Sequence, residues 1–259
     1  MPEAKAFVSQ VQGARFIEMP GVGHNYRDPR EWLPQFNDAY AALAAAASQN
    51  VPSAPGSLEG LPIVEVPASG DSDAFAVLVS GDGGWAGIDK EVAAALAEKG
   101  IPVAGVDSLR YFWSPRTPAG MARDLDRILQ YYSSTWHRKR ALVIGYSQGA
   151  DVLPFAVNRL PATTRGLVKL VAMIGISTSA SFEFHVSNWL GGGDNGLPTA
   201  PEIRKLSRTS ALCVYGDDDG DSICPQVNPA NARVVELSGG HHFGGDYGKL
   251  AGLILDSSR

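Results

Sequence analysis

The sequence contains only two cysteines, no long apolar run and no basic cluster longer than His137-Arg138-Lys139-Arg140, which is expected to be a solvated loop. Two cysteines cannot build a disulfide scaffold, although Cys213 and Cys224 could either bridge one loop or remain separate thiols. No apolar stretch approaches the roughly 20 residues that a membrane-spanning helix needs. The net charge of −5, without a Lys/Arg-rich block, argues against a nucleic-acid-binding surface. What remains is a globular chain of 259 residues with enough apolar mass for one sizeable core.

The first 50 residues echo the end of the chain. Residues 13–19 are predicted to form a strand, residues 20–24 a turn that carries His24, and residues 31–47 a helix. The same order of strand, glycine turn with histidine, and helix recurs over residues 232–255. We therefore expect residues 1–50 to be the tail of a truncated preceding domain of the same kind. The alternative is one more strand and helix on the main core.

Residues 51–60, rich in Pro, Ser and Gly, are predicted to be a linker to a main domain over residues 61–259. In the main domain, apolar strand candidates alternate with helix candidates. The strands are expected at 63–66, 75–79, 103–106, 142–144, 167–174, 211–215 and 233–237, and the helices at 86–98, 119–132, 148–158 and 246–255. This alternation predicts an α/β fold with a mostly parallel sheet covered by helices on both faces. In such sheets the functional site lies at the carboxyl ends of the strands.

Ser147 stands in the pentapeptide G-Y-S-Q-G, between an apolar β-branched run and a helix-compatible stretch. G-x-S-x-G between a strand and a helix is typical of a nucleophile elbow. A serine hydroxyl is a poor nucleophile, so it must be exposed at a sharp bend where a base can reach it. Gly145 and Gly149 would allow that bend, at the cost of strain in Ser147. The alternative, an ordinary strand-to-helix turn, is disfavoured by the flanking pattern.

Two later strand ends offer an acid and a base. The loop G-D-D-D-G-D-S-I-C-P contains the preferred acid, Asp221, and the alternate, Asp219. The turn S-G-G-H-H-F contains the preferred base, His241, and the alternate, His242. The order serine, acid, histidine is that of the α/β-hydrolase fold. In a triad of this kind the histidine moves the serine proton while the carboxylate orients the imidazole.

The glycine-rich turn S-G-D-G-G-W follows another strand and enters a helix. We expect the backbone amides of Asp82 and Gln148 to form an oxyanion hole there. A phosphate-binding loop is the alternative, but no G-x-x-x-x-G-K-[ST] pattern follows. Neither a metal site nor a cofactor is expected.

The remaining loops at this end are expected to shape the substrate pocket. The aromatic residues Trp85, Tyr111 and Trp113 could form an apolar wall, or could equally be core contacts. Asp217 and Asp218 could attract a cationic group, or belong to a solvated acidic loop. Residues 181–198 are predicted to form a small lid.

Together, the motifs S-G-D-G-G-W, G-Y-S-Q-G, G-D-D-D-G-D-S-I-C-P and G-G-H-H-F-G-G-D-Y resemble the bacterial VirJ/AcvB virulence family. The resemblance covers about residues 60–257, and the segment around His24 resembles the end of the extra domain of AcvB-like members. It implies a periplasmic α/β-hydrolase-fold enzyme that hydrolyses the aminoacyl ester of lysyl- or alanyl-phosphatidylglycerol at a membrane surface, and a link to type IV secretion. By position, it implies Ser147 as nucleophile, with the acid and base in the two loops above. The first residues, Met1-Pro2-Glu3, do not begin like a secretion signal, so the periplasmic expectation depends on the resemblance alone.

Two other functions are compatible with the same residues. The chain could be a non-catalytic adaptor that binds secretion components, although a binding module has no need of a strained serine. It could also be a carboxylesterase, lipase or thioesterase with another substrate, because a fold and a triad do not specify an acyl group.

Overall fold

A computed structural model describes residues 56–183, 196–206 and 211–258, together with residues 29–48 and a few positions before them (5, 8, 16–19 and 22). The chain divides into two compact units, Met1–Val51 and Pro52–Arg259. The division, between residues 51 and 52, falls within the linker expected at 51–60. That the first unit is the tail of a related domain stays a prediction.

In the first unit, helix α2 spans Pro29–Ser48 and confirms the helix expected at 31–47. Trp32 is buried and meets Phe36 edge to face, with 6.0 Å between the ring centroids. These residues lie one helical turn apart, so they share a face of the helix. The strand predicted at 13–19 is wrong for residues 16–19, which form no regular element. His24 lies outside the described residues.

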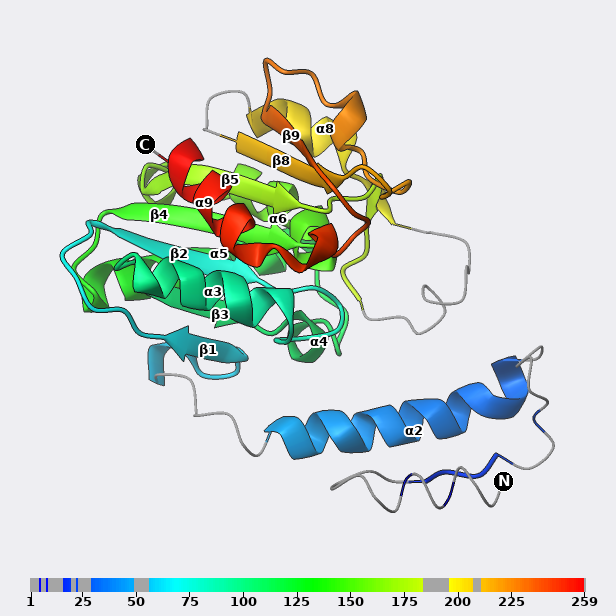
Figure 1. Cartoon of the computed structure of the whole chain (residues 1–259). Helices are drawn as coiled ribbons and strands as arrows, with labels where there is room; N and C mark the ends of the chain where they lie inside the picture. Colours follow the sequence, from blue (N-terminus) through cyan, green and yellow to red (C-terminus); the bar gives the residue numbers. More distant parts are fainter. Residues whose placement is uncertain are drawn as a thin grey trace. The chain divides into compact units, whose positions relative to one another are not determined.

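The second unit is built on a seven-stranded sheet with the order β1-β3-β2-β4-β5-β8-β9 (Figure 1). Only β1 runs antiparallel to its neighbour β3, and the other pairs are parallel. The strands are β1 Ile63–Val66, β2 Ala74–Val79, β3 Val103–Val106, β4 Arg140–Tyr146, β5 Val168–Ile174, β8 Ala211–Gly216 and β9 Arg233–Leu237. The predicted strands and the mostly parallel sheet are confirmed.

Helices cover both faces of the sheet (Figure 1). Helices α3 Ile88–Glu98 and α9 Tyr247–Ser257 pack on one face, and α5 Pro118–Thr135 and α6 Gln148–Asn158 pack on the other. Side chains of a strand alternate between faces, so Phe75 and Val77 join the core under α5 and α6 while Ala76 joins the other. A strand buried on both faces is apolar throughout, which explains the continuous run A-F-A-V-L-V of β2.

The smaller elements belong to the segments that connect these strands and helices along the chain. They are the helical turns η1 Gly56–Leu58, α4 Ser108–Tyr111, α7 Ala162–Arg165, α8 Ala200–Ile203, η3 Arg204–Leu206, η4 Cys224–Gln226 and η5 Phe243–Gly245, and the antiparallel pair β6 Ser179–Ala180 and β7 Leu197–Pro198. The predicted lid falls mainly on residues 184–195, which lie outside the described residues. Among the described helices, none has both the length and the apolar character needed to span a bilayer.

Candidate active site

Ser147 occupies a strained turn between β4 and α6. Its φ of 52° and ψ of −121° lie in a region that non-glycine residues rarely adopt. A methyl group on Gly149 would lie 2.1 Å from the carbonyl oxygen of Val79, and one on Gly145 would lie 2.5 Å from Gly149 itself. Only glycine fits at these two positions, so α6 can approach the strand ends closely enough to form the elbow.

His241 and Asp219 form a hydrogen-bonded pair at the ends of β8 and β9. His241 Nδ1 lies 2.8 Å from Oδ2 of Asp219, whose side chain is 7% exposed. The preference for Asp221 was therefore wrong, because the carboxylate on the imidazole belongs to the alternate, Asp219. Asp221 is exposed. Asp219 lies in a turn that is closed by the bond from its amide to the carbonyl oxygen of Gly216, at 2.9 Å.

The imidazole of His241 lies over the strand end next to the elbow. A side chain on Gly175, the residue after β5, would lie 2.8 Å from Cε1 of His241. The residue before it, Ile174, accepts a hydrogen bond from the Ser147 amide at 2.9 Å. The ring of His241 also faces that of Tyr146, with 5.3 Å between centroids. The structure therefore brings together the three stretches from which the sequence predicts nucleophile, acid and base.

His242, the alternate base, has another partner. Its Nδ1 lies 2.9 Å from the hydroxyl of Tyr146, and its side chain is exposed. The hydroxyl of Tyr146 is also 3.3 Å from the carbonyl oxygen of His241. Burial raises the pKa of Tyr146 well above its ordinary value, so this hydroxyl stays neutral at physiological pH. Sequence reasoning did not single out Tyr146, although its place directly before the nucleophile was a signal.

The predicted oxyanion loop lies beside the serine. A side chain on Gly81 would lie 3.4 Å from the Ser147 Cβ. The loop is anchored at Ser80, whose hydroxyl accepts from the Ser108 amide at 2.9 Å and whose carbonyl accepts from the Ser108 hydroxyl at 2.6 Å. The assignment of the Asp82 and Gln148 amides as oxyanion donors is consistent with this position and remains a prediction.

A buried carboxyl group lies behind the oxyanion loop. Asp89, in the first turn of α3, is 3% exposed, and its Oδ1 has no hydrogen-bond partner. Burial raises the pKa of Asp89 to about 7, although the amides of Ala86, Asp89 and Gly81 oppose the shift. Asp89 therefore changes charge near neutral pH, directly behind the loop expected to hold the oxyanion.

The three aromatic residues predicted to line the pocket have different places. Tyr111 is 2% exposed and its hydroxyl bonds to Asp124 at 2.6 Å, so it is a core contact and the prediction of a pocket role is wrong. Trp85 packs across β3, where a side chain on Gly105 would lie 2.3 Å from its ring. Trp113 is 43% exposed on the loop after α4 and remains a candidate for substrate contact.

The two acidic residues predicted to attract the substrate are exposed, but one of them has a local structural role. Oδ1 of Asp217 accepts a hydrogen bond from the amide of Gly239 at 2.7 Å. Asp218 contacts the same residue through its backbone, because its amide donates to the carbonyl oxygen of Gly239 at 3.2 Å. These bonds tie the loop of the acid, residues 217–224 (the acid loop below), to the loop of the histidine.

A strained serine after a central parallel strand, a histidine after the last strand and an acid after the strand before it define the α/β-hydrolase fold. The family model described as "Bacterial virulence protein (VirJ)" matches residues 73–259. The chain therefore belongs to the VirJ family, as its motifs indicate.

Solved structures show the same fold at low sequence identity. MenH from S. aureus is 13% identical, with a TM-score of 0.56 over 75% of this chain and 97% of that one. The enol-lactonase from Burkholderia xenovorans LB400 is 14% identical, with a TM-score of 0.53 over 75% and 95%. A thioesterase domain from the curacin biosynthetic pathway is 16% identical, with a TM-score of 0.52 over 74% and 94%. No curated protein sequence matches the chain. Family and fold together support a hydrolase.

Proposed function

We propose that the protein is a serine esterase that cleaves the aminoacyl ester of lysyl- or alanyl-phosphatidylglycerol. The observation that carries the proposal is the pairing of His241 with Asp219 beside the strained elbow of Ser147. A serine in this conformation costs stability, on the order of 1–3 kcal/mol. A site that keeps this strain next to a paired imidazole is suited to nucleophilic catalysis.

In the proposed mechanism Ser147 Oγ attacks the carbonyl carbon of the aminoacyl ester while Nε2 of His241 accepts the serine proton. Asp219, on the other ring nitrogen, keeps Nε2 free to accept and stabilises the imidazolium that forms. The backbone amides of Gln148 and Asp82 stabilise the negative oxygen. His241 then protonates the glycerol oxygen of the lipid, which leaves as phosphatidylglycerol. Water, activated by the same imidazole, hydrolyses the acyl-enzyme and releases the amino acid.

The family resemblance supplies the lipid substrate, and two surface features support it. The exposed acidic residues Asp217 and Asp218 would attract the ammonium group of the aminoacyl moiety. The exposed ring of Trp113 suits contact with a membrane surface, where tryptophan is enriched.

A periplasmic location is part of the proposal. Cys213 and Cys224 form a disulfide, which resolves the alternatives left open for the two thiols and supports an oxidising compartment. A link to type IV secretion, which the resemblance implies, stays a prediction with no residue assigned to it.

The test is hydrolysis of a pure lipid. Vesicles containing lysyl-phosphatidylglycerol are incubated with wild-type protein and with Ser147→Ala, and free lysine is measured by chromatography. The variant should lose at least about 10³-fold in turnover, since nucleophile and base act as a unit. Labelling of folded wild type by a fluorophosphonate should require Ser147. Full activity in the variant would exclude Ser147 as the nucleophile. No label on Ser147 in folded protein, together with no release of lysine, would favour the adaptor function.

A further inference from the structure

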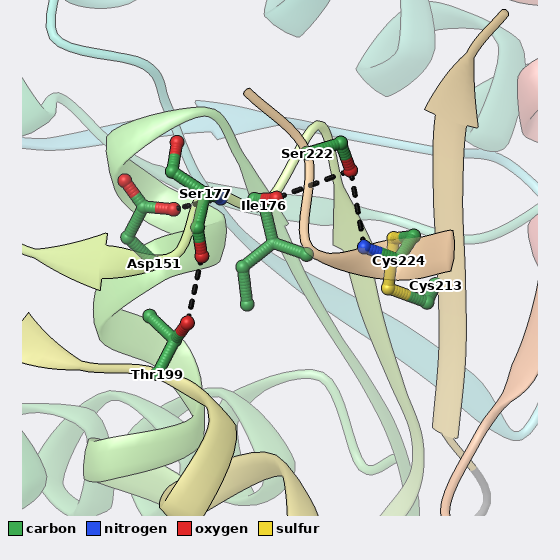
Figure 2. Close-up of a disulfide and its surroundings, with 7 residues drawn as sticks. All are labelled: Asp151, Ile176, Ser177, Thr199, Cys213, Ser222 and Cys224. Carbon is green, nitrogen blue, oxygen red and sulfur yellow. Dashed lines mark hydrogen bonds between the residues drawn. A yellow bond between two sulfur atoms is a disulfide. The ribbon is translucent and has the colours of Figure 1, made fainter. Parts of the chain in front are cut away.

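The acid loop is joined to the turn that follows β5, residues 175–178. Ser177 and Ser222 form an isolated antiparallel bridge, and the amide of Ile223 donates to the carbonyl oxygen of Ile176 at 3.0 Å. The buried hydroxyl of Ser222 donates to the same carbonyl at 3.2 Å and accepts from the amide of Cys224 at 3.2 Å (Figure 2). The acid loop, which follows β8, is therefore also bonded to the turn after the neighbouring strand β5.

The turn is held in place by a carboxylate on the nucleophile helix. Oδ1 of Asp151 accepts a hydrogen bond from the amide of Ser177 at 2.7 Å (Figure 2). On the other side of the same residue, the hydroxyl of Thr199 donates to the Ser177 carbonyl oxygen at 2.7 Å. Asp151 is only 9% exposed, so little water competes for the oxygen that accepts this bond. Asp151 and Thr199 thus hold the backbone of Ser177 from two sides.

Asp151 is also close in the chain to the nucleophile. Its amide donates to the carbonyl oxygen of Ser147 at 3.0 Å, within the first turn of α6. A continuous series of bonds therefore runs from the elbow through Asp151 and Ser177 to the acid loop, and ends at Asp219 on His241.

We propose that Asp151 is a positioning residue that keeps the acid loop, and with it Asp219, in register with the Ser147 elbow. The proposal deepens the esterase function and rests on it. The disulfide closes the loop onto β8 but does not connect it to α6, whereas Asp151 does. Catalytic groups lose about 100-fold in rate for a displacement near 1 Å, so a link of this kind affects turnover without touching the substrate.

The experiment compares Asp151→Ala with Asp151→Asn. The alanine variant removes the acceptor, while the asparagine side chain keeps a carbonyl oxygen that can accept the Ser177 amide. The matched control is Asp126→Ala on α5, which removes a hydrogen-bonded carboxylate that contacts Gln130 and Thr164 and neither loop. All variants are compared at a temperature where circular dichroism shows them fully folded.

The first measurement is hydrogen–deuterium exchange, which does not depend on catalysis. In Asp151→Ala, exchange at the amides of Ser177 and Ile223 and across the acid loop should become faster than in wild type. In Asp151→Asn and Asp126→Ala it should stay as in wild type. Unchanged exchange in Asp151→Ala would overturn the proposal, whether or not the protein proves to be an esterase.

The second measurement is hydrolysis of a small nitrophenyl ester. In Asp151→Ala kcat should fall about 10- to 100-fold while KM stays within about 3-fold, since orientation rather than binding is lost. In Asp151→Asn kcat should return to within about 3-fold of wild type, because the side-chain carbonyl oxygen can still accept the Ser177 amide. An equal fall of kcat and rise of KM in Asp151→Ala, or no recovery in Asp151→Asn, would show a merely structural role and overturn the proposal. If Asp151→Ala does not fold, Ser222→Ala, which removes the hydroxyl link, is judged by the same criteria.

Discussion

The hydroxyl of Tyr146 lies 2.9 Å from Nδ1 of His242 and ties the residue before the nucleophile to the histidine loop. The same hydroxyl is 3.3 Å from the His241 carbonyl oxygen, and the ring faces the imidazole of His241. One buried side chain thus contacts both residues of the histidine pair. We expect His242, the alternate base in the sequence, to support the loop through this contact.

Removing the Tyr146 hydroxyl should lower both stability and kcat without abolishing activity. In Tyr146→Phe the ring packing is kept, but His242 loses its partner, and the free energy of unfolding should fall by about 1 kcal/mol. We expect kcat to fall about 10-fold with little change in KM, because the base is held less firmly. Tyr131→Phe is the control, since that ring packs beside Tyr132 away from the site. Equal kcat in Tyr146→Phe and wild type would show that the histidine loop needs no such support.

The two candidate acids can be separated by one substitution each. Asp219→Asn should lower kcat by about 10³- to 10⁴-fold, because the amide favours the wrong tautomer of His241. Asp221→Asn removes an exposed carboxylate of the same loop and should leave kcat within about 2-fold, as surface substitutions usually do. Steady-state hydrolysis of an ester provides the measurement. A larger loss of kcat in Asp221→Asn than in Asp219→Asn would identify Asp221 as the acid of the triad.

Asp89 should make stability depend on pH in the acid range. Because burial raises the pKa of Asp89 from 3.8 to about 7, the folded protein holds a proton that the unfolded chain has released between these values. The contribution of Asp89 to the free energy of unfolding is therefore present below about pH 4 and is lost as pH rises, by about 1.4 kcal/mol per unit, until about pH 7.

Asp89→Asn removes this dependence. Urea denaturation of wild type and variant should show that the variant gains stability relative to wild type between about pH 5 and about pH 8. Asp71→Asn, at an exposed position, should follow wild type at both values. A constant difference between Asp89→Asn and wild type across this range would contradict the raised pKa.

Much of the sheet was predictable because its strands are short, mostly apolar runs separated by turn residues and helical stretches. Val103–Val106 and Arg233–Leu237 have the predicted bounds, and the glycine pattern placed Ser147 at its turn. The role of a residue could not be predicted where it depends on the direction of the side chain in the fold. The acid loop has four aspartates whose sequence context is similar. Which of them meets His241 depends on the backbone bonds of the folded turn, among them the bond from the Asp219 amide to Gly216.

Aromatic residues were ambiguous for a related reason. An aromatic side chain in a loop suits a pocket wall and a core equally well, and in Tyr111 the hydroxyl bond to Asp124 accompanies a core position. The link through Asp151 and Ser177 joins segments that are distant in sequence, and no local pattern indicates it. Its one signal was an acidic residue one helical turn after the nucleophile.

The disulfide should stabilise the acid loop and the whole second unit. Cys213 and Cys224 are fully buried and close a short loop that contains Asp219. Reduction should lower the free energy of unfolding by about 2–4 kcal/mol, as is typical of native disulfides. Denaturation with and without reductant measures the loss, and the double variant Cys213→Ala, Cys224→Ala should not respond to reductant. A wild type equally stable in both conditions would show that the bond contributes little.

The acidic residues of the acid loop should steer cationic substrates. Asp218 is the residue to neutralise, because its carboxylate is exposed, whereas the Asp217 carboxylate holds the Gly239 amide and its loss would disturb the loop. In Asp218→Asn, KM for a lysyl ester should rise about 2- to 5-fold at low salt, and less at high salt, since exposed charges are screened. KM for an uncharged ester of similar size should not change, which separates attraction from loop damage. An equal rise of KM for both esters would mean that the substitution disturbs the loop, and that the Asp218 charge does not attract the cationic substrate.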